Sequence, residues 1–240
     1  MTKMPKKGEG KILSEHLLEI RYPAFGEFFD IRGSLAEMLR RDMKFTDWEI
    51  ARNRIQVRNH SEKEKATESA FISFVNCGYR IARPATKNYF QDITSKFVRL
   101  AFSASAFNVQ KIRRLGVRSM FLTPIDADFE TLKEQCREKI FKGGDLLSEK
   151  LTAKLVDLNV ILNFKKGDYF FNTMIGPMEK DQMKQYFDYH QDLPELGLYF
   201  DIDYFQKDLK PDVRNMTHCI ADFETYAWEK LQIVQSFILE

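Results

Sequence analysis

The stretch that decides the fold lies in the middle of the chain and reads KIRRLGVRSMFLTP, from Lys111 to Pro124. It has the character of a β-strand, and Pro124 is expected to end it, because proline cannot donate a backbone hydrogen bond to a sheet. A long amphipathic helix is predicted directly before this strand, over 87–107. After it, the order of elements predicted for the first portion of the chain begins again.

The first portion opens with a strand in which apolar and charged residues alternate and which Pro23 ends. Ser34 and Glu37 have the spacing of a capping box, so a short helix is expected to begin at Gly33 and Ser34. The elements predicted for this portion are a strand over 12–22, a helix over 33–43, a strand over 47–59, an exposed charged loop over 60–65, a hairpin of 70–75 and 79–83 that turns at Asn76, Cys77 and Gly78, and the helix over 87–107.

The second portion repeats this order. Its predicted elements are the strand over 111–123, a helix over 128–141 closed by Gly143 and Gly144, a hairpin of 155–164 and 169–175, a strand over 196–205 and a helix over 213–239. The sequence therefore predicts an α+β fold of two similar halves, each running strand, helix, antiparallel strands and long helix, with helices covering a curved antiparallel sheet. The expected organisation is a flexible tail over 1–10, a first repeat over 11–108 and a second over 109–240. This element order also resembles the duplicated saddle of TATA-binding-protein-like folds, a likeness of topology alone.

The composition bears on where the protein is located and on whether it forms disulfides or binds zinc. Hydrophobic residues make up 44% of it, enough for a core, yet no run reaches the roughly 18 apolar residues that a membrane helix needs. The basic start lacks the apolar segment of a signal peptide. Three widely spaced cysteines, Cys77, Cys136 and Cys219, form no CxxC pair, which argues against a disulfide framework and a thiolate zinc site. A cytoplasmic location without a cofactor is expected.

The charge is distributed unevenly along the chain. The overall formal charge is +2, but residues 1–122 hold 23 lysines and arginines against 13 acidic residues, and residues 123–240 hold 14 against 22. The first part is therefore +10 and the second −8. Such asymmetry indicates a polyanionic partner for one part, a basic partner for the other, or self-association, unless folding interleaves the opposite charges.

The central strand carries the most distinctive candidate site. Arg114, Gly116 and Arg118 lie at alternate positions, so both guanidinium groups share one face of the sheet, about 7 Å apart, with no side chain between them. Such a pair could hold phosphates or carboxylates bidentately, and the glycine would admit close approach of a ligand or backbone. Arg113 is expected on the opposite face. The alternative is that these arginines pair with acidic side chains from the second half.

Asp201 and Asp203 share a strand face by the same alternation. Paired carboxylates bind Mg²⁺ or Mn²⁺, or hold a raised pKa for general-acid chemistry. A metal site usually requires a third ligand from another segment, which the sequence does not nominate, and these aspartates are equally suited to answer Arg114 and Arg118.

Motifs of the known catalytic classes are missing from the sequence. It contains no P-loop, no GxGxxG and no GxSxG, and its histidines show no HExxH or HxxxH spacing. The histidines are His16, His60, His190 and His218. His16 is expected to be a core or sheet-edge residue. His218 and Cys219 are adjacent on a predicted helix and so point about 100° apart, which argues against a nucleophile pair.

The central RxGxR motif of Arg114, Gly116 and Arg118 resembles that of an uncharacterised, sporadically distributed prokaryotic family of proteins about 250 residues long. The opening strand around Leu17–Tyr22 and the late strand around Leu198–Asp203 are similar to the same family, so the resemblance covers nearly the whole chain. The sequence departs from the family pattern at Ser119–Leu122, where an asparagine is usual. The resemblance implies no established activity, and the family's patchy distribution implies an accessory of a phage-defence or toxin–antitoxin system.

Three functional hypotheses follow. The first is a non-catalytic macromolecule-binding protein with a protein partner. The second is nucleic-acid binding through the basic first half, with Trp48 as a stacking surface; its arginines are Arg52, Arg54, Arg58, Arg113, Arg114 and Arg118. The third is a metal-dependent enzyme centred on Asp201 and Asp203. A homodimer is a further alternative, and no membrane partner is expected.

Overall fold

The structure is a computed structural model. It describes residues 5–59, 67–82, 84, 86, 88–104, 107–190 and 192–240. The predicted loop over 60–65 and its His60, together with residues 1–4 of the predicted tail, Arg83 and Lys87, lie outside the described residues.

Helices and strands contribute equally to the described chain. The strands are β1 (Lys6–Lys7), β2 (Leu13–Arg21), β3 (Asp47–Ile50), β4 (Arg54–Arg58), β5 (Glu68–Ser73), β6 (Asn76–Ala82), β7 (Ile112–Asp126), β8 (Val160–Lys166), β9 (Tyr169–Glu179) and β10 (Leu196–Leu209). The helices are α1 (Phe28–Met43), α2 (Tyr89–Ser103), α3 (Phe129–Ile140), α4 (Gly144–Leu151), α5 (Lys180–Met183) and α6 (Val213–Leu239).

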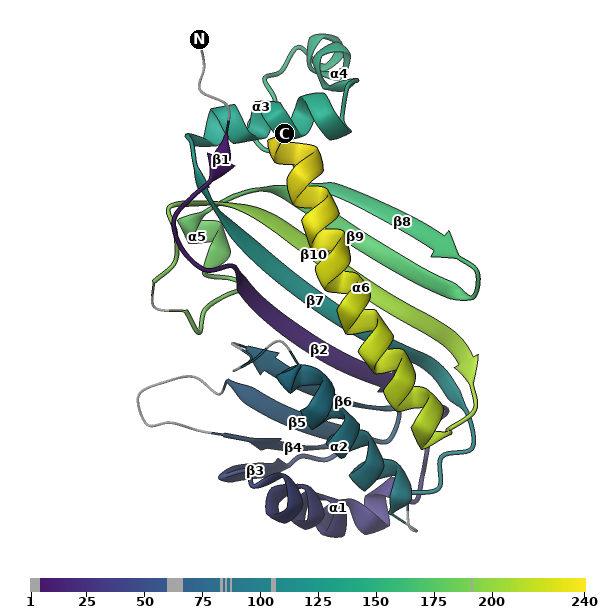
Figure 1. Ribbon diagram of the computed structural model, residues 1–240. Coiled ribbons are helices and arrows are strands. Elements are labelled where there is room, and N and C mark those ends of the chain that lie inside the picture. Colours follow the sequence, from purple (N-terminus) through teal and green to yellow (C-terminus); the bar gives the residue numbers. More distant parts are fainter. Residues whose placement is uncertain are drawn as a thin grey trace.

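The strands form one open, curved sheet in which all neighbours are antiparallel, in the order β3-β4-β5-β6-β2-β7-β10-β9-β8 (Figure 1). β2 and β7, the first long strand of each portion, lie side by side at its centre. Each is followed in the chain by a helix, then by the outer strands of its own side, then by a long helix. The predicted α+β class and curved antiparallel sheet are confirmed. The division into repeats over 11–108 and 109–240 stays a prediction, and both stretches contribute to the same sheet.

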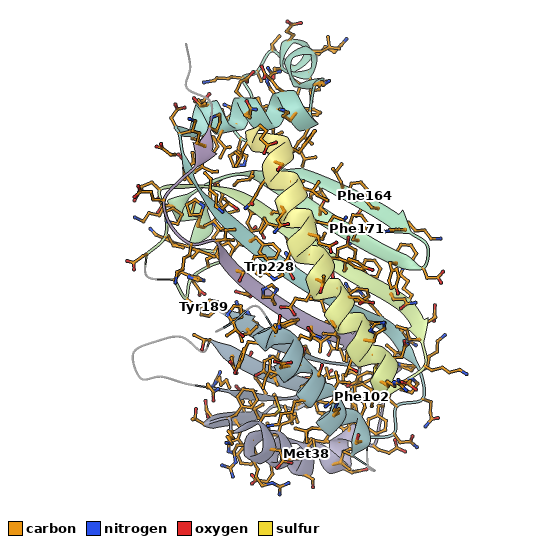
Figure 2. The ribbon with its side chains drawn as sticks, in the orientation of Figure 1. Met38, Phe102, Phe164, Phe171, Tyr189 and Trp228 are labelled. Carbon is orange, nitrogen blue, oxygen red and sulfur yellow. The ribbon has the colours of Figure 1, made fainter. Side chains whose placement is uncertain are left out.

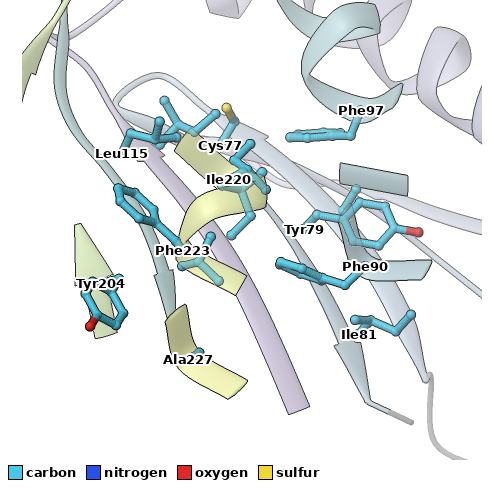
Figure 3. Packing of buried hydrophobic residues seen from close by; sticks show 14 of the residues in the cluster. Cys77, Tyr79, Ile81, Phe90, Phe97, Leu115, Tyr204, Ile220, Phe223 and Ala227 are labelled. Atoms are coloured by element: carbon cyan, nitrogen blue, oxygen red, sulfur yellow. The ribbon is translucent and has the colours of Figure 1, made fainter. Parts of the chain in front are cut away.

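The long helices cover one face of the sheet (Figure 1). α2 packs on β6 and on α6, α6 crosses β7 and β10, and α1 packs beside β3 and β4. Between helices and sheet lies a continuous apolar core, part of which Figure 3 shows around Phe90, Ile220 and Phe223. All three side chains are fully buried, and each contributes on the order of 1.5–3 kcal/mol to folding.

Helix α6 occupies the predicted range of 213–239. Its apolar residues recur every three or four positions, and Met216, Phe223 and Leu231 are buried against the sheet. The Asp212 carboxylate accepts a hydrogen bond from the backbone N–H of Asn215 at 2.7 Å and so caps the first turn. Local signals therefore suffice to place the beginning of this helix and its buried face.

Helix α1 begins earlier than predicted. It starts at Phe28, so Gly33 and Ser34 lie inside the helix and not at its beginning. Glu37 forms no capping box and accepts hydrogen bonds from Arg40 instead. The Phe28 side chain is fully buried, so packing against the core extends the helix upstream of the local capping signal.

The turn between β5 and β6 is also displaced from its predicted position. It lies at Phe74 and Val75, whereas Gly78 stands within β6, between β2 and β5. A Cβ atom at Gly78 would come within 2.3 Å of the Leu18 carbonyl oxygen and 2.7 Å of the Phe71 ring. This glycine therefore permits close packing and does not make a turn.

Two further differences concern strands. The strand predicted over 47–59 is a hairpin of β3 and β4, closed by a hydrogen bond from the Ala51 N–H to the Arg54 carbonyl at 2.9 Å. β7 continues through Pro124, because β2 pairs with β7 only as far as Leu122 and the missing N–H removes no bond to β2 there. The Pro124 carbonyl accepts from the Gly8 N–H at 2.8 Å, and β1 pairs with the end of β7, so this part of the predicted tail joins the sheet.

Candidate functional site

The face of the sheet opposite α1, α2 and α6 carries the candidate site, and we refer to it as the open face. His16 of β2 and Phe121 of β7 pack against Trp228 of α6, so the residues that alternate with them point away from the helices. At one end of the open face, Met183 and Phe187 cover Tyr199 in a small second core. Charged side chains occupy its centre, and we call them the ion-pair row. Its members are Glu15, Glu19, Arg80, Arg114, Arg118, Asp201 and Asp203.

Arg118 and Asp201 form a bidentate pair within this row. The Arg118 Nε donates to both Asp201 carboxylate oxygens at 3.1 and 3.0 Å, and Nη2 donates to Oδ2 at 2.5 Å. The Asp201 side chain is 9% exposed and that of Arg118 is 43% exposed. The hydrogen bond from Arg118 to Asp201 raises the pKa of the guanidinium, which therefore stays charged. One edge of Arg118 remains open to solvent.

Arg114 is held more tightly. Its Nη2 donates to both oxygens of Asp203 at 2.6 Å, its Nη1 lies 3.3 Å from a Glu19 oxygen, and its guanidinium carbon lies 4.6 Å from the centre of the Phe205 ring. A side chain at Gly116 would meet this guanidinium within 2.7 Å. The glycine in the RxGxR motif therefore makes room for Arg114 itself.

The carboxylates that surround Arg114 have shifted pKa values. Burial raises the pKa of Asp203 and is only partly offset by Arg114. Burial also acts to raise the pKa of Glu19, but hydrogen bonds from Arg21 and Asn76 outweigh it and hold that pKa below its ordinary value.

A third pair joins β2 and β6. Arg80 donates to the two carboxylate oxygens of Glu15 at 2.5 and 3.0 Å. Glu15 is only 3% exposed, and burial raises its pKa in spite of the arginine. The Arg80 guanidinium stacks over the ring of Tyr189, 4.5 Å from its centre, and Figure 2 shows Tyr189 at the margin of the sheet.

A shallow hollow of about 350 Å³ adjoins Arg118 on the open face. Its lining residues come from β7, β8, β9, β10 and the segment after α5. They are Arg118, Ile161, Asn172, Thr173, Met174, Tyr186, Asp201 and Asp203. The hollow combines a guanidinium, two carboxylates, amide and hydroxyl groups and apolar side chains, so it suits a polar group from a partner of mixed charge.

The structure does not bring the six predicted arginines together. Arg114 and Arg118 lie in the ion-pair row, where the carboxylates from the second half answer them as the sequence allowed. Arg113 lies exposed at the start of β7, where alternation along the strand turns it away from Arg114, and Arg52 is exposed in the turn between β3 and β4.

The other two predicted arginines lie on β4, separated from β7 by β5, β6 and β2. Arg54 stacks over the Phe71 ring at 4.9 Å, and Arg58 donates to Asp47 at 2.8 Å. Trp48 stands opposite the buried Val57, away from these arginines on the other side of the hairpin. The proposed stacking of Trp48 beside these arginines therefore finds no support in their arrangement.

The aspartate pair is engaged by arginines. The carboxylates of Asp201 and Asp203 each accept hydrogen bonds from a guanidinium group, Asp201 from Arg118 and Asp203 from Arg114. Within the described residues, no three histidine, cysteine, aspartate or glutamate side chains lie close enough to hold a metal ion.

The histidines and cysteines form no catalytic pair in the described chain. His16 is fully buried in the core, with Nδ1 2.8 Å from the Ser119 hydroxyl, whereas His218 is exposed on α6, 3.7 Å from Asp222. His190 lies beside the Phe187 ring in the covered end of the open face. The three cysteines are buried as free thiols, and burial raises the pKa of each, to about 12 for Cys136. Reactive thiolates are not favoured at these positions.

Sequence reasoning missed Glu15, Glu19, Arg80 and Tyr189. The alternation in the opening strand places both glutamates on one face, which was a usable signal for their orientation. Their partnership with Arg80 and Arg114 follows from β2 lying between β6 and β7, which no local pattern reveals.

Comparison with known proteins identifies no family for the chain. No family model matches it, and no curated protein does. Among solved structures, the chain is similar to the rolling circle replication initiator protein from Geobacillus stearothermophilus, with a TM-score of 0.27 and 9% identity over 88% of this chain and 80% of that one. A likeness this weak carries no argument about function. Among the described helices, none has the length and apolar character needed to cross a bilayer.

Proposed function

We propose that the chain is a non-catalytic binding protein that docks another protein on the open face of its sheet. The observation that carries this proposal is the ion-pair row. Taking charged groups out of water costs free energy, and well-packed apolar side chains of similar volume stabilise a protein as well or better. Three pairs with carboxylates as little as 3% and 9% exposed are therefore poorly explained by stability alone.

The ion-pair row has the properties of a surface that recognises a partner protein. Each arginine is fixed by a carboxylate, and Arg80 and Arg114 are also fixed by an aromatic ring, so little side-chain entropy remains to be lost when a partner binds. The row alternates positive and negative groups across β6, β2, β7 and β10. A protein surface of mixed charge complements this pattern, whereas the carboxylates of the row repel the phosphates of a nucleic acid.

Photo-crosslinking from two matched positions tests the proposal. A photoreactive amino acid replaces exposed Asn172, beside the hollow on the open face, or exposed Thr225, on the outer surface of α6. In cells of the source organism, we expect position 172 to give a discrete crosslink to a protein other than a second copy of this chain, and position 225 to give none. The crosslink should weaken when the pair is reversed by Arg118→Asp with Asp201→Arg, which keeps opposite charges in contact.

Three results would count against protein docking on this face. They are crosslinks from position 225 alone, crosslinks that the reversed pair leaves unchanged, and recovery of nucleic acid in place of protein. The last result would support the nucleic-acid hypothesis. A salt series would then show affinity falling steeply as the salt concentration rises.

A further inference from the structure

The outer strand β8 is an exposed, apolar edge of the sheet. It ends the strand order, and no strand of the described chain pairs with its outer side (Figure 1). Ile161 is 66% exposed and Phe164 is 44% exposed. Four more exposed apolar side chains, Leu146, Leu147, Leu151 and Val156, lie in α4 and in the segment between α4 and β8. An edge of this kind presents unpaired backbone groups to any other extended chain.

The opposite edge of the sheet also exposes apolar side chains, Trp48 and Ile50, but it is better protected against pairing. β3 has only four residues, two of them are the acidic Asp47 and Glu49, and α1 packs beside it. Short length, charge and a covering helix are the means by which proteins keep sheet edges from pairing. β8 has seven residues and no charged side chain from Val160 to Phe164, so it lacks the short length and the charges that protect β3 from pairing.

The geometry of the β8–β9 hairpin shows which backbone groups of β8 are free. Lys166 and Tyr169 flank the two-residue turn of Gly167 and Asp168, and Gly167 has a φ of 60°. Residues that flank such a turn exchange hydrogen bonds, and bonded positions then alternate along the strand. The N–H and C=O groups of Ile161, Asn163 and Lys165 therefore point outward, away from β9.

We propose that β8 pairs in antiparallel fashion with β8 of a second copy of this chain, forming a twofold symmetric dimer with one continuous sheet. Outward-pointing residues must face each other in such a pair. Placing Asn163 opposite Asn163 of the partner subunit aligns all three outward residues of each copy and makes six backbone hydrogen bonds. A shift of two residues in either direction leaves some of these groups unpaired.

The same register gives compatible side-chain neighbours. Ile161 lies opposite the partner's Lys165, and Leu162 lies opposite the partner's Phe164. The lysines at the end of β8 do not face each other, because each lies beside an apolar residue of the other copy. Apolar cross-strand pairs stabilise a sheet and facing like charges destabilise it, so β8 is complementary to itself.

A proline substitution tests whether the outward backbone groups are used. Asn163→Pro removes an N–H that makes no bond within one copy, and proline is tolerated at such edge positions. We expect the wild-type protein to dimerise in sedimentation velocity and Asn163→Pro to dimerise at least about tenfold more weakly. Asn163→Ser, which keeps the N–H, serves as the control and should dimerise like the wild type. Circular dichroism verifies that each variant is folded.

A charge pair at one position tests the register. Ile161→Lys places a lysine opposite the partner's Lys165 twice in the dimer, whereas Ile161→Glu places a carboxylate there. We expect Ile161→Lys to weaken dimerisation at least about tenfold relative to Ile161→Glu, with the difference shrinking at high salt. The amides of Ile161, Asn163 and Lys165 should also exchange hydrogen more slowly as the wild-type concentration rises.

Several results would overturn the proposal. A wild-type protein that remains monomeric up to about 100 µM would do so, since a dimer weaker than this would have little stability. Dimerisation that survives Asn163→Pro unchanged, or that treats the two Ile161 variants alike, would show that copies associate through another surface or register.

Discussion

The buried imidazole of His16 yields a quantitative prediction about the pH dependence of stability. The side chain is fully buried in β2, its ring centre lies 5.2 Å from that of Phe90 and 5.6 Å from that of Phe121, and its Nδ1 is 2.8 Å from the Ser119 hydroxyl. The Nε2 atom has no hydrogen-bond partner among the described residues. Such an environment disfavours the charged ring, and burial lowers the pKa of His16 from 6.5 to about 3.

The direction of the effect follows from proton binding. Between pH 6.5 and about 3, the unfolded chain binds a proton at His16 and the folded protein does not, so the free energy of unfolding falls as the pH is lowered through this range. One pKa unit corresponds to about 1.4 kcal/mol. The contribution of His16 to stability should therefore decrease by about 2 kcal/mol between pH 7 and pH 5, and by about 4 kcal/mol by pH 3.

Urea unfolding at pH 7 and pH 5 measures this contribution. His16→Gln removes the titrating group, and the difference between its unfolding free energies at the two pH values should be smaller than that of the wild type by about 2 kcal/mol. His218→Gln, which replaces an exposed histidine on α6, should keep the wild-type difference. If His16→Gln retains the full pH dependence, the buried ring is not the source of the acid sensitivity, and the reasoning fails.

Two further predictions concern packing and charge. Gly78→Ala should lower the free energy of unfolding by roughly 1–3 kcal/mol, because the new Cβ meets the Leu18 carbonyl oxygen. Gly143→Ala, whose Cβ has no atom within 4 Å, should change the free energy of unfolding by less than about 0.5 kcal/mol. Equal effects of the two substitutions in urea unfolding would contradict this packing. Arg118→Ala should destabilise the protein by about 1–3 kcal/mol by leaving Asp201 unpaired, and Arg118→Met with Asp201→Leu should restore most of the loss. A double variant less stable than the single one in the same assay would show that the pair is needed for stability.

The sequence correctly predicted elements whose apolar pattern and capping residues lie within or next to the element itself. α6 has a long apolar stripe and an aspartate cap, and both of its ends were predicted correctly. The β3–β4 hairpin was missed because its turn, at Ala51, Arg52 and Asn53, contains neither glycine nor proline to distinguish it from a strand. The helix predicted over 33–43 was too short at its beginning. α1 starts at Phe28, and the burial of Phe28 depends on core residues that lie far from it in the sequence.

The candidate site shows the same limit. Alternation placed Arg114 and Arg118 on one face and Asp201 and Asp203 on one face, and their mutual pairing was an open alternative. Choosing it required the knowledge that β7 and β10 are neighbours with Arg118 in register with Asp203. Glu19, 95 residues before Arg114, could be assigned only once β2 was known to lie on the other side of β7.

The ion pairs between β7 and β10 account for part of the uneven charge along the chain. The arginines of the RxGxR motif belong to the basic first part and their aspartates to the acidic second part, yet they meet on adjacent strands. Part of the charge difference is therefore neutralised by ion pairs within the molecule. Less of it remains to attract the basic part of one copy to the acidic part of another. Self-association through β8 does not depend on that difference, because its hydrogen bonds come from the backbone. The open face and the β8 edge adjoin at Ile161, which lines the hollow, but they use different groups: side-chain charges on the open face and backbone hydrogen bonds at the edge. Variants at Arg118 and at Asn163 should therefore affect different partners.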